Sequence, residues 1–131
     1  PLKSTPTIRP LLVCKPGAKG TLPAAPEAVK RVLDPPPLSG TPAQFALGEK
    51  LYTNSCSVCH GSSGVAGVLN PDLRYSVSLG NPKLWQDIVH DGLLKANGMV
   101  GWSGQFNREQ IEAIRLYVIK RANEDKALGD H

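Results

Sequence analysis

Two cysteines and a histidine stand together at one point of this 131-residue chain: Cys56, Cys59 and His60, in the pattern C-x-x-C-H. Two thiols at this spacing can each add to a vinyl group of the same porphyrin, and the histidine that follows then lies under the iron. The pattern therefore predicts one covalently attached haem c, bound through Cys56 and Cys59, with His60 as the proximal iron ligand.

A second axial ligand is expected from Met99, the single methionine of the chain. It lies in a glycine-rich stretch, residues 97–101, where the backbone can pass close to a porphyrin while one side chain points inward. A thioether ligand raises the reduction potential relative to a second histidine. His90, on a short predicted helix, and His131, the last residue, are the weaker alternatives.

Further residues are candidates for contacts around such a haem. The carbonyl of Pro71 is expected to accept the other ring N–H of His60, a bond that fixes the tautomer of a ligating histidine. Buried carboxylates such as haem propionates need donors or opposite charge. The candidates to hold them are Arg74, Tyr75, Trp85 and Trp102, although each also suits an ordinary core or surface position. No catalytic residue is predicted in the chain.

Three helices are predicted to position these residues. The first, over 43–54, follows Thr41 as its cap, and the second, of about ten residues, begins after the cap Asn81. The third, over 107–124, follows Asn107, with a glutamine three residues on as in a capping box. Glycine and proline punctuate the remaining segments, which are predicted loops over residues 61–80 and 93–106.

The first 42 residues have a different composition, since they hold ten of the twelve prolines. Such a segment excludes a long helix and favours extended, semi-rigid chain. We therefore predict a Pro-rich linker over 1–41, with a short strand at 11–14 and an idle thiol at Cys14, followed by one domain over 42–131. The chain begins at a proline with no recognisable leader, so a mature or excised piece is expected.

Composition argues against several classes of protein. An odd number of cysteines does not suggest a disulfide framework. The net charge of +4 is carried by scattered Lys and Arg, which gives no support for nucleic-acid binding. No run reaches the roughly 18 apolar residues of a membrane span. Haem c is attached outside the bacterial cytoplasm, so the periplasm is the expected compartment.

Two other kinds of site would use the same cysteines and histidine. A zinc-binding module is one, although the adjacency of Cys59 and His60 and the lack of a suitably spaced fourth ligand argue against it. A thiol oxidoreductase is the other, but no alternation of strands and helices surrounds the cysteine pair.

The chain resembles class I cytochrome c over about residues 42–124. In that family a glycine and an aromatic residue of the first helix cross an aliphatic and an aromatic residue of the last, and here Gly48 and Tyr52 match the first pair and Ile114 and Tyr117 the second. Close helix contact would also compensate for glycine inside a helix. The resemblance implies an all-α class I cytochrome c fold, with three to five helices around a covalent haem c, preceded by an extended Pro-rich tail.

A more specific resemblance involves residues 67–76, 97–99 and 113–124. They are similar to the C-terminal cytochrome domain of PQQ-dependent quinohaemoprotein alcohol dehydrogenases, and residues 10–17 are similar to the final strand of the propeller domain of those enzymes. In that family the propeller holds pyrroloquinoline quinone (PQQ) and calcium, oxidises an alcohol and passes electrons singly to the haem.

The second resemblance implies an electron-transfer domain of such an enzyme. Its electron donor would be reduced PQQ in a dehydrogenase domain, and its acceptor another periplasmic redox protein. PQQ and calcium would then belong to a partner or a missing domain. The alternative is a free-standing, diffusible periplasmic cytochrome c.

Overall fold

The computed structural model describes residues 17, 24, 31–66 and 69–129. Within these residues the chain forms helices and loops and no strand, as the predicted all-α class requires. Its α-helices are α1 (Pro42–Ser55), α2 (Ser57–His60), α3 (Pro82–Val89) and α4 (Arg108–Ala127). Short 3-10 turns lie between them: η1 (Ser62–Gly64), η2 (Leu73–Tyr75), η3 (Val77–Gly80) and η4 (Lys95–Asn97). The predicted strand at 11–14 and Cys14 lie outside the described residues.

The three longer helices begin where the sequence predicts. The hydroxyl of Thr41 accepts from the backbone N–H of Gln44, whose side chain accepts in return from the backbone N–H of Thr41. Asn107 and Gln110 form the same reciprocal box at the start of α4. Asn81 caps α3 by accepting from a backbone N–H three residues on. Each cap satisfies backbone donors that the first helical turn leaves open.

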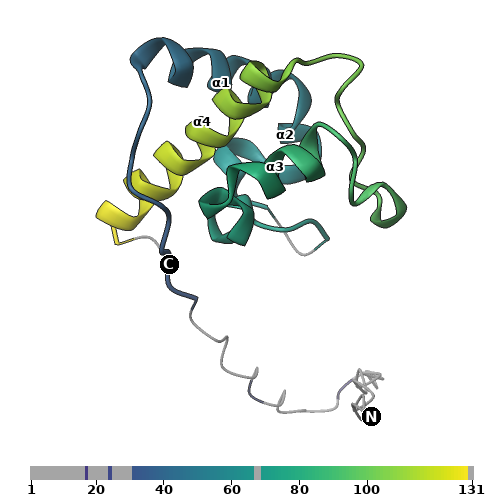
Figure 1. Cartoon of the computed structure of the whole chain (residues 1–131). Helices are drawn as coiled ribbons and strands as arrows, with labels where there is room; N and C mark the ends of the chain where they lie inside the picture. The colour runs from purple at the N-terminus through teal and green to yellow at the C-terminus, as the bar shows by residue number, and fades with distance from the viewer. Residues whose placement is uncertain (1–16, 18–23, 25–30, 67–68, 130–131) are drawn as a thin grey trace, which may run out of the picture.

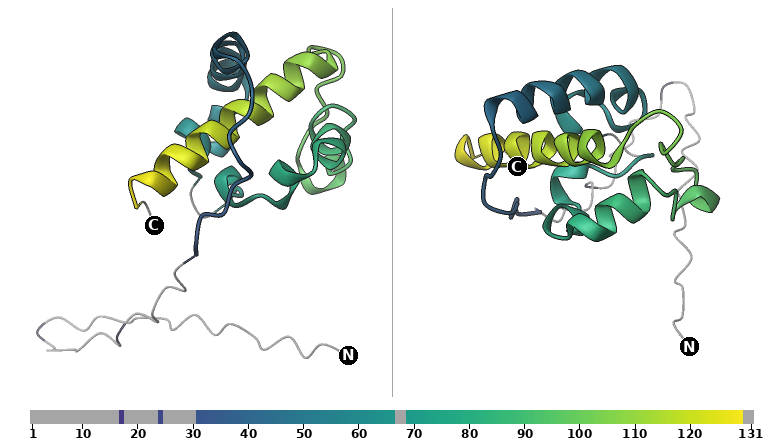
Figure 2. Two further views of the ribbon diagram at one scale, coloured as in Figure 1. Left: turned by 60° about the vertical axis from the view of Figure 1, so that its left-hand side comes forward. Right: turned by 45° about the horizontal axis from the view of Figure 1, so that its top comes forward.

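Helix α4 lies between α1 and α3 (Figure 2). The contact with α1 is closest at Gly48, where a Cβ atom would stand 2.0 Å from the carbonyl oxygen of Ala113 and 2.8 Å from the Cβ of Tyr117. One turn along, the rings of Tyr52 and Tyr117 meet with their centroids 5.4 Å apart. The predicted close approach at Gly48 is confirmed, because only a residue without a side chain fits there.

The hydrophobic core fills the space on both sides of α4. Trp85 and Val89 are buried on the inner face of α3, and the indole N–H of Trp85 donates to the carbonyl of Ile111 at 3.1 Å. That bond satisfies the one polar group of a buried tryptophan and joins α3 to α4. The buried core consists of Tyr52, Leu79, Trp85, Val89, Ile111, Ile114, Tyr117, Val118 and Ile119.

An extended segment, residues 31–40, precedes α1 and runs past the C-terminal end of α4 (Figure 1). We call it the N-terminal strap. Its Leu33 is only 3% exposed, and the carbonyl of Pro36 accepts from the side-chain amide of Asn123 at 2.9 Å. The guanidinium of Arg31 lies 4.2 Å from the ring centroid of Tyr75. The strap therefore packs on the helical domain, although the sequence places it in the linker.

Among the described helices none is both long and apolar enough to cross a membrane.

Candidate haem site

The C-x-x-C-H motif lies at the junction of two helices. Cys56 ends α1 and also caps α2, and its carbonyl accepts from the backbone N–H groups of Cys59 at 3.2 Å and His60 at 2.9 Å. Residues three apart on a helical turn lie on the same side, so this turn places both thiols together. Cys56 is half-buried and Cys59 is exposed, and neither forms a disulfide.

Burial raises the pKa of the Cys56 thiol to about 11, and the neighbouring Cys59 thiol raises it further as a smaller cause. Cys56 is therefore a neutral thiol at neutral pH in the absence of a bound group. In the part of the chain that the structure describes, no three or more His, Cys, Asp or Glu side chains gather in a metal-binding group. A ligand set for zinc is thus not assembled among these residues.

The ring of His60 is held by a single backbone contact. Its Nδ1 lies 3.2 Å from the carbonyl oxygen of Pro71. A carbonyl can only accept, so Nδ1 carries a proton, and in the neutral imidazole Nε2 then has the lone pair. This is the contact expected from the sequence, and it leaves the imidazole in the form that binds iron.

Two further side chains hold the backbone around the motif. The hydroxyl of Tyr52 donates to the carbonyl of Gly61 at 2.7 Å and lies 3.2 Å from that of His60. Burial raises the pKa of Tyr52 above its usual range, which keeps this donor protonated. From the other side, the amide of Asn70 donates to the carbonyl of Cys59 at 2.7 Å. Sequence reasoning missed Asn70, for which the only signal was an Asn-Pro turn.

Met99 stands at the end of a loop whose two ends meet. A Cβ on Gly101 would lie 2.9 Å from the backbone nitrogen of Gly92, and the backbone N–H of Trp102 donates to the carbonyl of Val89 at 2.9 Å. Gly92 has φ +78°, which an L side chain rarely adopts. The two glycines thus bring together the two ends of the loop that carries Met99. From the sequence, Gly92 is predicted only to end the second helix and Gly101 only to lie in a loop.

The apolar surroundings of the motif suit a porphyrin. Several half-buried side chains pack against the core without being covered by protein, and they include Cys56, Leu73, Ile88, Met99 and Trp102. Most of the large apolar side chains that the described residues expose also fall between positions 58 and 100, and Val58, Leu69 and Val77 are each more than four-fifths exposed. A porphyrin attached at the motif would give exposed side chains of this kind an apolar partner. The donor set and its surroundings therefore fit a haem.

The four candidates for the propionates have other contacts within the protein. All three side-chain nitrogens of Arg74 donate to carboxylates, and the indole N–H of Trp85 is engaged by Ile111. The ring of Tyr75 lies under Arg31. Trp102 stacks on a phenylalanine with centroids 5.4 Å apart. Their role toward propionates stays a prediction.

His90, one of the two alternative histidine ligands, is engaged by a carboxylate. Nδ1 of His90 is 2.6 Å from a carboxylate oxygen of Asp91, which also accepts from Arg108 at 3.0 Å. The hydrogen bond from His90, followed by that from Arg108, lowers the pKa of Asp91 despite its exposure. His90 thus belongs to an ion-pair group between α3 and α4, and His131 lies outside the described residues.

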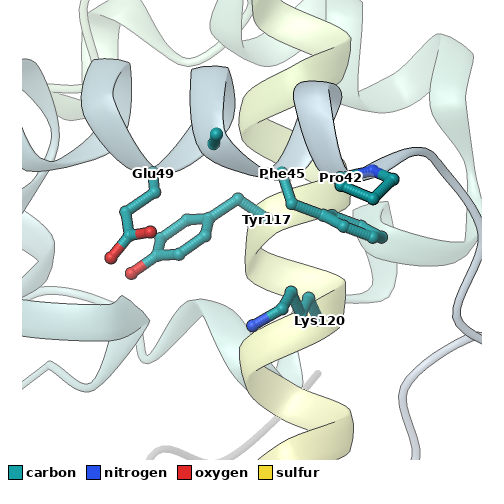
Figure 3. A pocket seen from close by; sticks show the side chains of 6 residues that line it. Pro42, Phe45, Glu49, Tyr117 and Lys120 are labelled. Atoms are coloured by element: carbon teal, nitrogen blue, oxygen red, sulfur yellow. The ribbon is translucent and has the colours of Figure 1, made fainter.

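Two hollows of the surface lie against α1 and α4 rather than at this motif. One is a shallow pocket of about 360 Å³ between α1 and α4, lined by Pro42, Phe45, Ala46, Glu49, Tyr117 and Lys120 (Figure 3). It contains none of the predicted haem contacts. A site for a covalently attached group is therefore recognised here by its donors rather than by a cavity.

Comparison with known protein families agrees with a haem site at Cys56, Cys59 and His60. The family model described as "Cytochrome C oxidase, cbb3-type, subunit III" matches residues 43–118, more than half of the chain. The chain belongs to this family of c-type cytochromes. As a cytochrome c domain it is an electron-transfer module, and its family implies a covalently attached haem c.

Similar proteins include dehydrogenases that are far longer than this cytochrome domain. Quinohemoprotein alcohol dehydrogenase ADH IIB of Pseudomonas putida is 42% identical over 88% of the chain, which spans 17% of that protein. The dehydrogenase subunit of the alcohol dehydrogenase (quinone) of Gluconobacter oxydans is 39% identical over 59% of the chain and 10% of its own length.

A solved structure has the same fold. Quinohemoprotein alcohol dehydrogenase ADHIIG of Pseudomonas putida HK5 superposes with a TM-score of 0.69 at 33% identity, over 78% of this chain and 15% of that one. The cytochrome domain thus spans less than a fifth of each of these relatives.

Proposed function

We propose that this domain carries a single haem c, bonded through thioethers to Cys56 and Cys59, with His60 and Met99 as the axial ligands. The contact between Nδ1 of His60 and the Pro71 carbonyl supports this most directly, because it leaves Nε2 as a ligand beside the two thiols. When bound, the haem supplies a one-electron Fe(III)/Fe(II) couple. The protein orients the ligands, and its apolar side chains exclude water from the site.

We further propose that the domain receives electrons one at a time from reduced PQQ of an alcohol dehydrogenase and passes them to a periplasmic redox protein. PQQ and calcium would be bound outside this chain, in a dehydrogenase domain. The similarity to quinohemoprotein alcohol dehydrogenases supports this assignment. The chain itself would then be the electron-transfer part of a larger enzyme.

The ligand assignment is tested by visible spectroscopy of the purified protein. The reduced protein is expected to show a c-type α band, and Met99→Ala is expected to abolish the thioether-to-iron charge-transfer band of the oxidised form. His90→Ala is the matched control, since His90 is paired with Asp91, and should leave that band unchanged. Absence of the α band would exclude haem c, and a charge-transfer band that survives in Met99→Ala would exclude Met99.

The donor assignment needs the intact protein from its source. Mass spectrometry gives the size of the native chain, and adding an alcohol under anaerobic conditions should reduce the haem when PQQ and calcium are bound. A native mass equal to that of the 131-residue chain, with no reduction by alcohols, would instead support the free-standing cytochrome.

A further inference from the structure

We propose that a buried ion-pair network of Asp72, Arg74 and Asp125 is a positioning element for the proximal ligand, because it holds the Pro71 carbonyl against Nδ1 of His60. This inference depends on the proposed role of His60. Arg74 is a candidate propionate contact from the sequence, but no sequence motif assigns Asp72 or Asp125 to the site, and Asp125 lies 65 positions beyond His60 in the C-terminal helix.

Pro71 is placed by its neighbours in the chain. It is exposed, and a proline has no N–H with which to anchor itself. On one side Asn70 is tied to the carbonyl of Cys59 at 2.7 Å. On the other side Asp72 is buried and caps η2 by accepting from the backbone N–H of Arg74 at 3.1 Å. The position of the Pro71 carbonyl therefore depends on where Asp72 is held.

Arg74 holds Asp72 in place through a two-point contact. Its Nε donates to one carboxylate oxygen at 3.1 Å and its Nη2 to the other at 2.8 Å. A bidentate pair of this kind fixes both the distance and the plane of the carboxylate. The remaining nitrogen, Nη1, donates to Asp125 of α4 at 3.1 Å. The η2 segment is thereby fastened to α4 by charge-assisted hydrogen bonds.

The position of Asp125 indicates that its role is to pair with Arg74. It lies in the last turn of α4, where the helix dipole disfavours a negative charge, and it is only 7% exposed. Arg74 supplies the compensating charge, assisted by Arg121 at 3.3 Å. Removing one member of a buried pair leaves an uncompensated charge, so such a network tolerates little displacement.

The contact that the network supports is sensitive to small movements. A separation of 3.2 Å between Nδ1 and the carbonyl oxygen is at the long end of the range for N–H···O bonds. A shift of Pro71 by a few tenths of an ångström would therefore weaken it. A weaker bond makes the imidazole a poorer electron donor, which favours reduced iron and raises the reduction potential.

The test uses Asp125→Asn in the haem protein, with Glu124→Gln as its matched control. Both variants remove one negative charge from adjacent positions of α4. Glu124 is partly exposed and is paired with Lys120 and Arg121 rather than with Arg74. Its pKa is lowered, chiefly by the hydrogen bond from Lys120, so a full charge is lost at neutral pH. Any general electrostatic effect on the iron should therefore appear in both.

The first readout is the exchange rate of the His60 Nδ1 proton, followed by NMR. Asp125→Asn is expected to accelerate exchange about tenfold, which corresponds to roughly 1.4 kcal/mol of local stability. Glu124→Gln should change it less than about twofold. The second readout is the reduction potential, which should rise more in Asp125→Asn than in the control. If Asp125→Asn does not fold, Asp72→Asn, which retains an acceptor for the Arg74 backbone, replaces it.

Equal exchange rates and equal reduction potentials in Asp125→Asn and Glu124→Gln would overturn the positioning role. If both variants still show the c-type α band, the haem assignment stands. An unmodified protein without a c-type α band would instead overturn the proposed function. The two failures are thus distinguished by one spectrum.

Discussion

At the level of single residues, the chemistry of the site depends on which side-chain atoms already have hydrogen-bond partners within the protein. Nδ1 of His60 is held by Pro71, which reserves Nε2 for a metal. The indole of Trp85 and the guanidinium of Arg74 are engaged within the protein. The hydroxyl of Tyr52 has a less obvious part, because it joins the first helix to the backbone that directly follows the cysteine pair.

The two tyrosines of the helix crossing give a matched test of that hydroxyl. Tyr52→Phe keeps the ring contact but removes the donor to Gly61, and should lower the free energy of unfolding by about 1 kcal/mol. For the hydroxyl of Tyr117 the described residues offer no hydrogen-bond partner, so Tyr117→Phe should cost less than about 0.5 kcal/mol. Chemical denaturation of the haem protein measures both, and equal losses would argue against a role for the Tyr52 bond.

At the level of elements, the domain depends on the crossing of α1 and α4. A glycine inside a helix lowers helix stability by about 1 kcal/mol relative to alanine. In α1 this glycine is Gly48, where a Cβ would meet the backbone of Ala113. The close approach lets the rings of Tyr52 and Tyr117 pack in a tilted arrangement, with an angle of 47° between their planes. It also places the end of α1, which carries the cysteine pair, at a defined position along α4. The crossing thus determines where the motif begins.

Gly48→Ala tests the crossing. The new Cβ would lie 2.0 Å from a backbone oxygen that cannot move alone, and overpacking of this kind should lower the free energy of unfolding by about 3 kcal/mol, which outweighs the gain in helix propensity. Gly104→Ala is the control, because nothing lies within 4 Å of a Cβ there. Denaturant unfolding monitored by helical circular dichroism compares the two, and a stabilised Gly48→Ala protein would contradict the contact.

At the level of the whole molecule, the strap extends the domain beyond its helices. Leu33, Pro36 and Arg31 contact the domain at different points, and Lys126 of α4 lies 3.3 Å from Asp34. The ion pair is exposed and contributes little, so burial of Leu33 should dominate. The segment directly before α1 is therefore packed on the domain from Arg31 onward.

Substitutions of two leucines in the strap test whether it is packed on the domain or is a loose linker. Leu33→Ala, at a buried position, should lower the free energy of unfolding by about 3 kcal/mol, whereas Leu38→Ala, at a position 54% exposed, should change it by less than about 0.5 kcal/mol. Thermal or denaturant unfolding of the two variants provides the measurement. If Leu33→Ala were as stable as Leu38→Ala, the strap would not belong to the folded domain.

The sequence by itself determined the local features of this protein. The spacing of Cys56, Cys59 and His60 specifies its chemistry, and caps such as Thr41 and Asn107 specify where helices begin, because both depend on residues a few positions apart. The glycine in α1 even predicts a helix crossing, since its cost requires a compensation. These features are short-range, and they can be recognised without knowledge of the fold.

Only the tertiary structure decided which buried polar groups are partners. Arg74 and Asp125 are 51 residues apart, and nothing in either segment distinguishes a carboxylate of α4 from a haem propionate as the partner of this guanidinium. The packing of Leu33 was likewise hidden inside a Pro-rich stretch. Burial makes such pairings obligatory, but the identity of each partner follows from how the helices cross, which periodicity and composition do not encode.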